Sequence, residues 1–179
     1  MMEQCMKRTA AGSTLLTILL LWIHRRIPGS IPPALPITAA TVAYHFLMRL
    51  CVGEVLNRTL RNRVDYTRPW FRVGDREMTL YKRLRVRKWK NRMPTYDSSL
   101  FDPALHTWDE IAQAMCQSEL VHEWNALLSF LPLLAAIRFG AFWVFLITSL
   151  LSAGYDLLFV AMQRFNRPRV LRMIQKRKG

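Results

Sequence analysis

The sequence predicts an all-α integral membrane helical bundle of about four spans with a basic cytoplasmic amphipathic insert. Of the 179 residues 51% are apolar, yet the net charge is +14. The apolar residues fall in separate blocks, whereas Lys and Arg crowd residues 58–92 and 164–178. This segregation suits a membrane protein whose basic segments lie against anionic lipid headgroups. A nucleic-acid-binding protein could carry the same charge, but it would not need several lipid-compatible segments.

The four expected spans follow one another along a single membrane domain, residues 1–179. They are residues 10–23, 35–52, 120–137 and 139–162. The first is short, because about twenty residues are needed to cross the hydrocarbon core, and it is interpreted as a signal anchor or first helix. A proline-rich connection separates it from the second span. Within the second span His45 and Arg49 share a helical face, and Arg49 is expected to reach back to the membrane interface.

The third span is expected to belong to a long helix that begins outside the membrane. Thr107 followed by Glu110 forms a capping box, which marks a helix start. The helix is predicted to run to about Leu134 and to enter the membrane near His122. Residues 138–140 offer the turn into the fourth span.

The distribution of Lys and Arg sets the expected orientation. Residues 53–119, the predicted cytoplasmic insert, carry thirteen Lys or Arg, whereas the loop between the last two spans carries only Arg138. The tail, residues 163–179, is again basic. We therefore expect a multi-pass protein of the bacterial cytoplasmic membrane, with both termini and its functional site on the cytoplasmic side.

Residues 74–92 of the insert alternate apolar and basic side chains. Leu80 and Leu84 share one helical face, and Arg85 and Lys88 share another. The pattern is typical of an amphipathic helix that lies among membrane lipid headgroups. A solvated basic helix that packs its few apolar residues on the bundle would show the same pattern.

Three polar residues stand where the third helix should enter the membrane: Glu119, His122 and Glu123. At about 100° per residue they share one helical face, with the imidazole between two carboxylates. A carboxylate can orient an imidazole and raise its basicity, as a general base requires. The alternative is a helix end whose charges face water or the basic insert.

A second polar group follows in the fourth span, where an ionised Asp156 would be costly unless paired. Beyond it, near the expected cytoplasmic end, come Gln163, Arg164, Asn166, Arg167 and Arg169. Because the last two spans are antiparallel neighbours, this group should meet the group on the third helix. The meeting point predicts either a site for an anionic or carbonyl-bearing substrate or an interfacial cluster of salt bridges.

These residues resemble a known family, the glycosyl-4,4'-diaponeurosporenoate acyltransferases. The resemblance rests on VRKWK at 86–90 with a following Pro94, ELVH at 119–122 and QRFNRPR at 163–169, in this order. It extends over roughly residues 70–172. The chain departs from the family pattern at three positions. Glu123 replaces Trp, Asp156 replaces Asn and Phe165 replaces Tyr.

The resemblance implies a membrane enzyme that moves a fatty acyl group from acyl-CoA or a similar thioester to a hydroxyl of a glycosylated lipid or carotenoid. Membrane lipids are then its surroundings, and no cofactor, metal or nucleic acid is implied. Carried over by position, the resemblance points to Trp89, Lys90, Glu119, His122, Gln163, Arg164, Asn166, Arg167 and Arg169.

From these residues we form a mechanistic hypothesis. His122, oriented by Glu119 or Glu123, removes the acceptor's proton, while Asn166 or Arg167 stabilises the oxyanion. Substrate binding is expected from Trp89, Lys88, Lys90, Gln163, Arg164, Arg169 and Asp156. A lipid-binding accessory protein without chemistry is the main alternative, and a transporter subunit that uses Asp156 and His45 is a further one.

Overall fold

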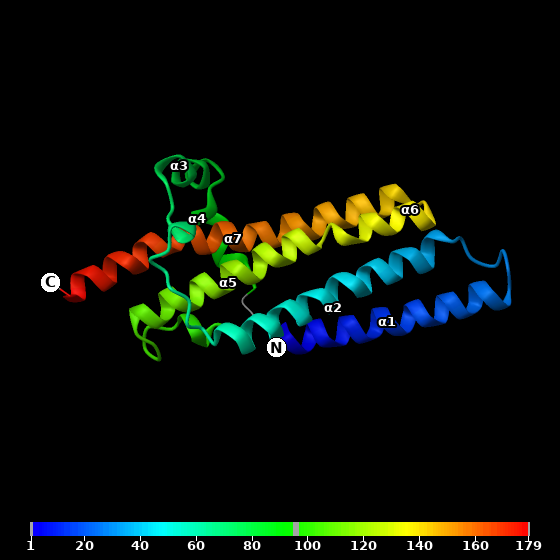
Figure 1. Ribbon diagram of the computed structural model, residues 1–179, viewed down its shortest axis with the longest axis horizontal. Helices are drawn as coiled ribbons and strands as arrows, with labels where there is room; N and C mark the ends of the chain where they lie inside the picture. The colour runs from blue at the N-terminus through cyan, green and yellow to red at the C-terminus, as the bar shows by residue number, and fades with distance from the viewer. Residues whose placement is uncertain (1, 95–96, 179) are drawn as a thin grey trace. The chain divides into compact units, whose positions relative to one another are not determined.

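The computed structural model describes residues 2–94 and 97–178. The chain is 80% helical, with no strand among the described residues, which confirms the all-α class. In chain order the elements are α1 (Met2–Arg26), α2 (Ala34–Leu60), η1 (Pro69–Phe71), α3 (Asp75–Arg83), α4 (Val86–Trp89), η2 (Lys90–Arg92), η3 (Ser99–Phe101), α5 (Trp108–Leu128), η4 (Leu131–Ala135), α6 (Ala136–Phe139) and α7 (Phe142–Lys178) (Figure 1).

Among the described residues, three helical stretches are long and apolar enough to cross a membrane. They are Ala34–Leu60, Trp108–Phe139 and Phe142–Arg177. These stretches contain the second and third expected spans and residues 142–162 of the fourth, whose first residues precede α7. The first expected span, residues 10–23, lies inside α1, which has 25 residues but carries charged residues in its first and last turns. Three of the four expected spans therefore correspond to helical stretches that are long and apolar enough to cross a membrane.

Contacts divide the chain into two compact units. The first contains the described residues up to Gly53 together with Trp124–Tyr155. The second contains Glu54–Glu123 and the described residues from Asp156 onward. Helices α2, α5 and α7 each contribute to both units. The prediction that the whole chain is one membrane domain stays a prediction.

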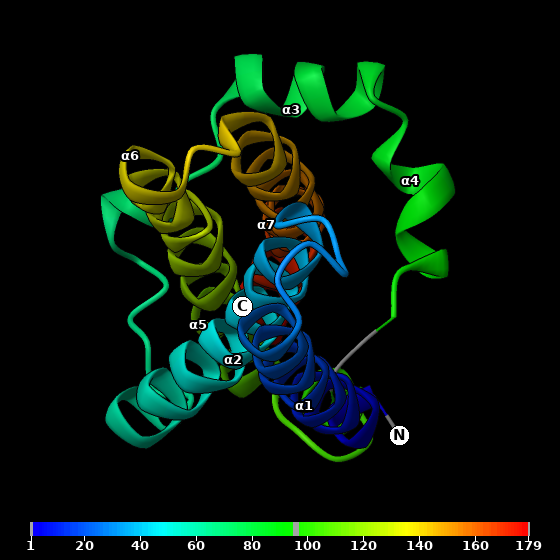
Figure 2. The same cartoon turned by 90° about the vertical axis from the view of Figure 1, so that its right-hand side faces the viewer.

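In the first unit α1 and the start of α2 run antiparallel and side by side (Figures 1 and 2). Tyr44 on α2 donates a hydrogen bond to the Leu128 carbonyl at 2.8 Å. Arg49 donates to the Ser152 hydroxyl on α7 at 2.8 Å, and His45 Nδ1 lies 3.0 Å from the same hydroxyl. The expectation that Arg49 reaches back to the interface is therefore wrong, because its guanidinium bonds to a neighbouring helix.

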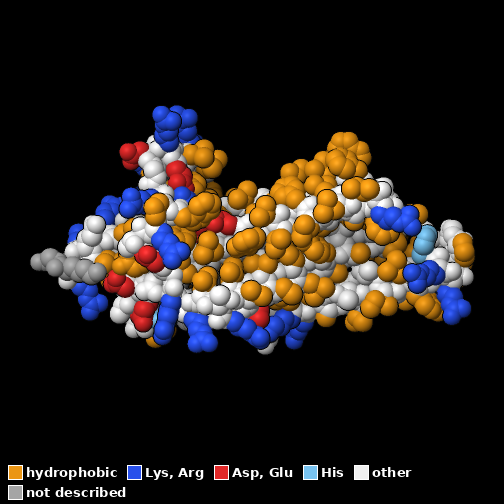
Figure 3. All heavy atoms as spheres, viewed as in Figure 1, with side chains coloured by type: hydrophobic (Ala, Val, Ile, Leu, Met, Phe, Trp, Pro, Cys, Tyr) orange, Lys and Arg blue, Asp and Glu red, His pale blue; other side chains and the backbone are white. Residues whose placement is uncertain are grey.

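The outer surface of the first unit is strongly apolar. Hydrophobic side chains gather over α6 and the beginning of α7 (Figure 3). Ile137 is 88% exposed, and Trp143 and Leu151 are each 70% exposed. Large contiguous apolar surfaces are unfavourable in water, so this surface fits contact with lipid.

The helix cap and the turn lie where the sequence predicts them, but one helix ends earlier than expected. Thr107 and Glu110 form the expected capping box, with Glu110 N donating to Thr107 Oγ1 at 3.3 Å. Helix α5 ends at Leu128 rather than near Leu134, because Pro132 lies in the following 3-10 turn and supplies no backbone donor. The reversal into α7 uses Gly140 and Ala141, both with positive φ.

In the second unit the basic insert is not one continuous amphipathic helix. Helix α3 ends at Arg83, and Arg85 adopts a left-handed φ of 53° before α4 begins. Leu80 and Leu84 are 51% and 55% exposed. Tyr81 and Val86 are instead buried against Phe165 of α7. The expected tail is helical, since α7 continues past Pro168 to Lys178; Gly179 lies outside the described residues.

Candidate functional site

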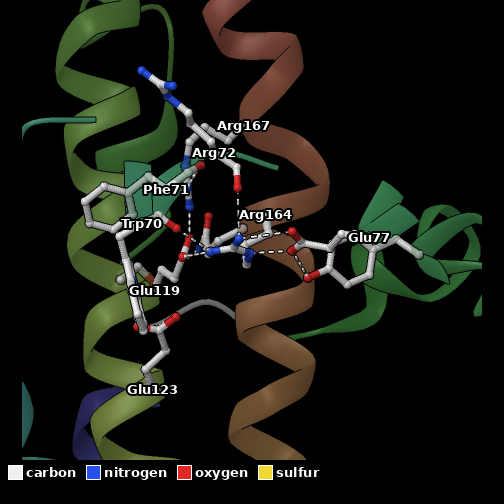
Figure 4. Close-up of polar contacts among 11 residues, drawn as sticks. Trp70, Phe71, Arg72, Glu77, Glu119, Glu123, Arg164 and Arg167 are labelled. Carbon is white, nitrogen blue, oxygen red and sulfur yellow. Dashed lines mark hydrogen bonds and ion pairs between the residues drawn. The ribbon is translucent and has the colours of Figure 1, made fainter. Parts of the chain in front are cut away.

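The carboxylate of Glu119 on α5 is fully buried and belongs to the second unit. Its Oε1 accepts a hydrogen bond from Arg164 Nη1 at 2.6 Å, and its Oε2 forms an ion pair with Arg167. Both arginines come from α7 (Figure 4). The third and fourth expected helices therefore do meet here, as predicted.

Arg164 has a second acidic partner. Its guanidinium also bonds both oxygens of Glu77 on α3, with the Nη2 to Oε2 distance at 3.0 Å. Arg167 is fully buried, and its partner groups include the Phe71 carbonyl and the Phe71 ring. Two guanidiniums and two carboxylates thus form a cluster whose charges balance.

The arginines also fix a short segment of backbone. Arg164 donates to the carbonyls of Trp70 at 3.0 Å and Arg72 at 3.1 Å. Arg167 donates to the intervening Phe71 carbonyl at 2.7 Å. Three successive carbonyls around η1 are therefore held by α7, a connection that Figure 4 displays.

His122 belongs to a different polar pair. Its Nδ1 lies 2.9 Å from Asp156 Oδ1, and the Asp156 side chain is only 1% exposed. The imidazole stacks on Phe159 with 4.4 Å between ring centroids and 7° between planes. Its side chain is 21% exposed. The ring is therefore fixed in orientation and remains partly accessible.

The expected pairing of His122 with Glu119 or Glu123 is wrong. Glu119 is occupied by two arginines, and Glu123 Oε2 accepts a hydrogen bond from the Trp70 indole at 3.0 Å. The orienting carboxylate comes from the other helix, as Asp156. The buried carboxylate that the sequence marked as costly is thus paired.

Two cationic side chains lie near the aromatic ring of Phe165 on α7. Lys90 and Arg169 lie 5.8 and 5.7 Å from the ring centroid, and Lys90 Nζ donates to Asn166 Oδ1 at 2.5 Å. Burial lowers the pKa of Lys90, and the nearby charges of Arg169 and Arg87 lower it further. Such mutual repulsion favours the binding of an anion between these side chains.

The remaining predicted residues lie around these groups. Gln163 donates to Ser118 on α5 at 3.2 Å. The Trp89 indole donates to the Leu84 carbonyl at 3.1 Å, which closes the bend between α3 and α4. Lys88 is exposed on α4.

The sequence alone did not single out Glu77 and Trp70. Glu77 lies in a strongly basic stretch, four residues before Tyr81, whose hydroxyl donates to it at 2.5 Å. Burial acts to raise the pKa of Glu77, but the hydrogen bonds from Arg164 and Tyr81 lower it overall. The sequence shows two acids, Asp75 and Glu77, at the start of this basic stretch, and it does not indicate which of them is paired. Trp70 gave no signal, because its partners lie far along the chain.

No group of three or more His, Cys, Asp or Glu is placed to hold a metal ion within residues 2–94 and 97–178.

The fold and the site define a helical membrane protein whose second unit holds both a carboxylate-paired histidine and a group of cationic side chains. Compared with known families, residues 63–176 match the model of the glycosyl-4,4'-diaponeurosporenoate acyltransferases. The match covers more than half of the chain, so the chain belongs to this acyltransferase family. The resemblance stated for residues 70–172 is confirmed. No curated protein and no solved structure matched.

Proposed function

We propose that this protein is an acyltransferase of the bacterial cytoplasmic membrane, with its site on the cytoplasmic side. It moves a fatty acyl group from a thioester such as acyl-CoA to a hydroxyl of a glycosylated lipid or carotenoid. Family membership supports the reaction class. The mechanism rests on one observation: His122 Nδ1 lies 2.9 Å from Oδ1 of the buried Asp156 carboxylate.

In the proposed mechanism the Asp156 carboxylate accepts a hydrogen bond from Nδ1–H of His122, and Nε2 is then the basic nitrogen of the ring. Nε2 takes the proton of the acceptor hydroxyl as its oxygen attacks the thioester carbonyl carbon. The C–S bond then breaks, and the proton passes from Nε2 to the departing sulfur.

For the developing oxyanion we favour Asn166 over Arg167. The Oδ1 atom of Asn166 accepts from Lys90, so the amide presents its N–H groups as donors. Arg167 is fully buried and bonded to Glu119 and Phe71. We therefore assign Arg167 and Glu119 to positioning of the backbone and helices rather than to contact with substrate.

The donor's phosphates fit the cations around Phe165. Lys90 and Arg169 have no acidic partner among the described residues, and the exposed Lys88 lies two residues from Lys90. Ammonium and guanidinium groups are the usual ligands of phosphate. Arg164, by contrast, is neutralised by Glu77 and Glu119, which argues against its expected role in donor binding.

The test is the His122→Ala variant, assayed in membranes with a fatty acyl thioester and a glycosylated lipid. We expect transfer to fall by about 10²–10⁴-fold, the contribution of a positioned base. His106→Ala is the matched control, because His106 lies in the same unit, before α5. Normal transfer by a folded His122→Ala protein would favour the lipid-binding accessory role instead.

A further inference from the structure

Trp70 combines high exposure with a fixed position. Its side chain belongs to η1 and is 64% exposed. A large aromatic ring on an irregular segment would normally adopt several rotamers and bury what it can. Here both its backbone and its ring are restrained, which indicates a surface prepared for a ligand.

The backbone restraint comes from α7. The Trp70 carbonyl accepts from Arg164, and the next carbonyl, of Phe71, accepts from Arg167. Phe71 is itself buried beside Val64 and Cys116. The segment that presents Trp70 is therefore anchored on both its polar and its apolar side.

The ring restraint comes from Glu123 on α5. The indole Nε1 donates to Glu123 Oε2 at 3.0 Å, so the ring cannot turn without losing this bond. Figure 4 places the indole edge directly over the Glu123 carboxylate. No hydrogen bond reaches Glu123 Oε1 from the described part of the chain. An exposed aromatic face and an available carboxylate oxygen thus lie together.

This pair suits a sugar ring. The negative face of an aromatic ring attracts the weakly positive C–H groups on the apolar face of a pyranose. A carboxylate accepts hydrogen bonds from sugar hydroxyls. The negative charge of Glu123 would repel a phosphate, so the thioester donor's phosphates belong elsewhere. Glu123 also directly follows His122 on α5.

We propose that Trp70 and Glu123 bind the sugar of the glycosylated acceptor and thereby favour sugar hydroxyls over other alcohols. This inference rests on the proposed acyl transfer. It adds two residues that touch the acceptor and gives the departure at Glu123 a role. The rival occupant is the lipid interface, where exposed tryptophans commonly lie.

The experiment compares two acceptors with the same chain, octyl glucoside below its micelle concentration and octanol. Purified protein in nanodiscs receives a fatty acyl-CoA, and kcat/KM is measured for each acceptor. We expect Trp70→Ala to reduce the preference for the glucoside by about 10-fold. Transfer to octanol should be unchanged. Trp70→Phe, which keeps an aromatic face, should retain part of the preference and guards against misfolding of the alanine variant.

The matched control is Trp143→Ala, because Trp143 is also exposed, at 70%, but belongs to the first unit. It should leave the preference intact. Equal losses for both acceptors in Trp70→Ala would identify a lipid anchor and overturn the proposal, as would an unchanged preference.

A failure of the proposed function itself would look different. Wild-type protein would then transfer to neither acceptor. Binding of octyl glucoside would still test the sugar site. The amount bound would be compared between nanodiscs that contain the protein and empty nanodiscs. Binding lost in Trp70→Ala but kept in His122→Ala would support the site, and equal binding in all three proteins would overturn it.

Discussion

Removing the buried carboxylate of Glu119 is the most informative perturbation of this protein. In Glu119→Gln the side chain keeps its size and loses its charge. The carboxylate and Arg167 are both 0% exposed, and Arg164 is 14% exposed. Water therefore cannot replace the lost negative charge around Arg167, because the Phe71 carbonyl and ring that also contact this guanidinium are neutral.

The structure also sets the size of the effect. Breaking a buried ion pair by removing one partner costs about 3–5 kcal/mol, because the remaining charge stays buried. Arg164 keeps Glu77, so the uncompensated charge is that of Arg167 alone. We expect a loss of about 3 kcal/mol, the lower end of that range. Removing both charges in Glu119→Gln/Arg167→Met should recover about 2 kcal/mol of it.

Reversible unfolding in mixed detergent micelles, followed by far-UV circular dichroism, measures these free energies. Glu54→Gln is the control, because the Glu54 ion pair with Arg58 is exposed and such pairs contribute little. If the effects of Glu119→Gln and Arg167→Met simply add, or if Glu119→Gln matches the control, the buried cluster does not stabilise the fold as argued.

Three other variants test separate parts of the site. Asp156→Asn should lower kcat by about 10²-fold, because a neutral amide does not balance the positive charge that forms on the His122 imidazole when it takes the acceptor's proton, and an unchanged kcat would contradict this. Burial acts to raise the pKa of Glu77, but its hydrogen bonds place it below the ordinary 4.5. The ionised Glu77 therefore stabilises the fold fully above pH 4.5, and this contribution is lost as the pH falls. The unfolding free energy of Glu77→Gln should decline less steeply on acidification than that of the wild type, and parallel declines in the two proteins would refute the assignment. Lys90→Ala should raise KM for an acyl-CoA donor with little change in kcat, and an effect that high salt fails to diminish would argue against phosphate binding.

The helices could be predicted from the sequence because their signals are local. Apolar runs of about twenty residues and a capping box depend on neighbours within a few positions. Thr107 and Glu110 form the expected cap, and the three stretches that are long and apolar enough to span a membrane cover nearly all of the second, third and fourth expected spans. The break at Arg85 was missed, because a single left-handed residue in a basic stretch leaves the apolar spacing intact.

The partners within the site could not be predicted in the same way. Glu119, Glu123 and Asp156 all offered His122 a carboxylate, and the first two were closer along the chain. The rotation of α5 against α7 within the second unit decides the choice, since it turns Glu119 to the arginines and His122 to Asp156. Arg164 meets Glu77 across 87 positions of sequence, a separation with no periodic signal.

The sequence by itself determined an apolar helical membrane protein with segregated basic segments and the polar residues of the site. These features are set by composition and helical period, which are properties of the chain in one dimension. Tertiary structure alone decided that Asp156 pairs with His122, that Arg167 is buried, and that the Trp70 side chain is exposed but fixed in position. Those outcomes depend on the angles at which helices pack, and a one-residue rotation of about 100° exchanges one partner for another.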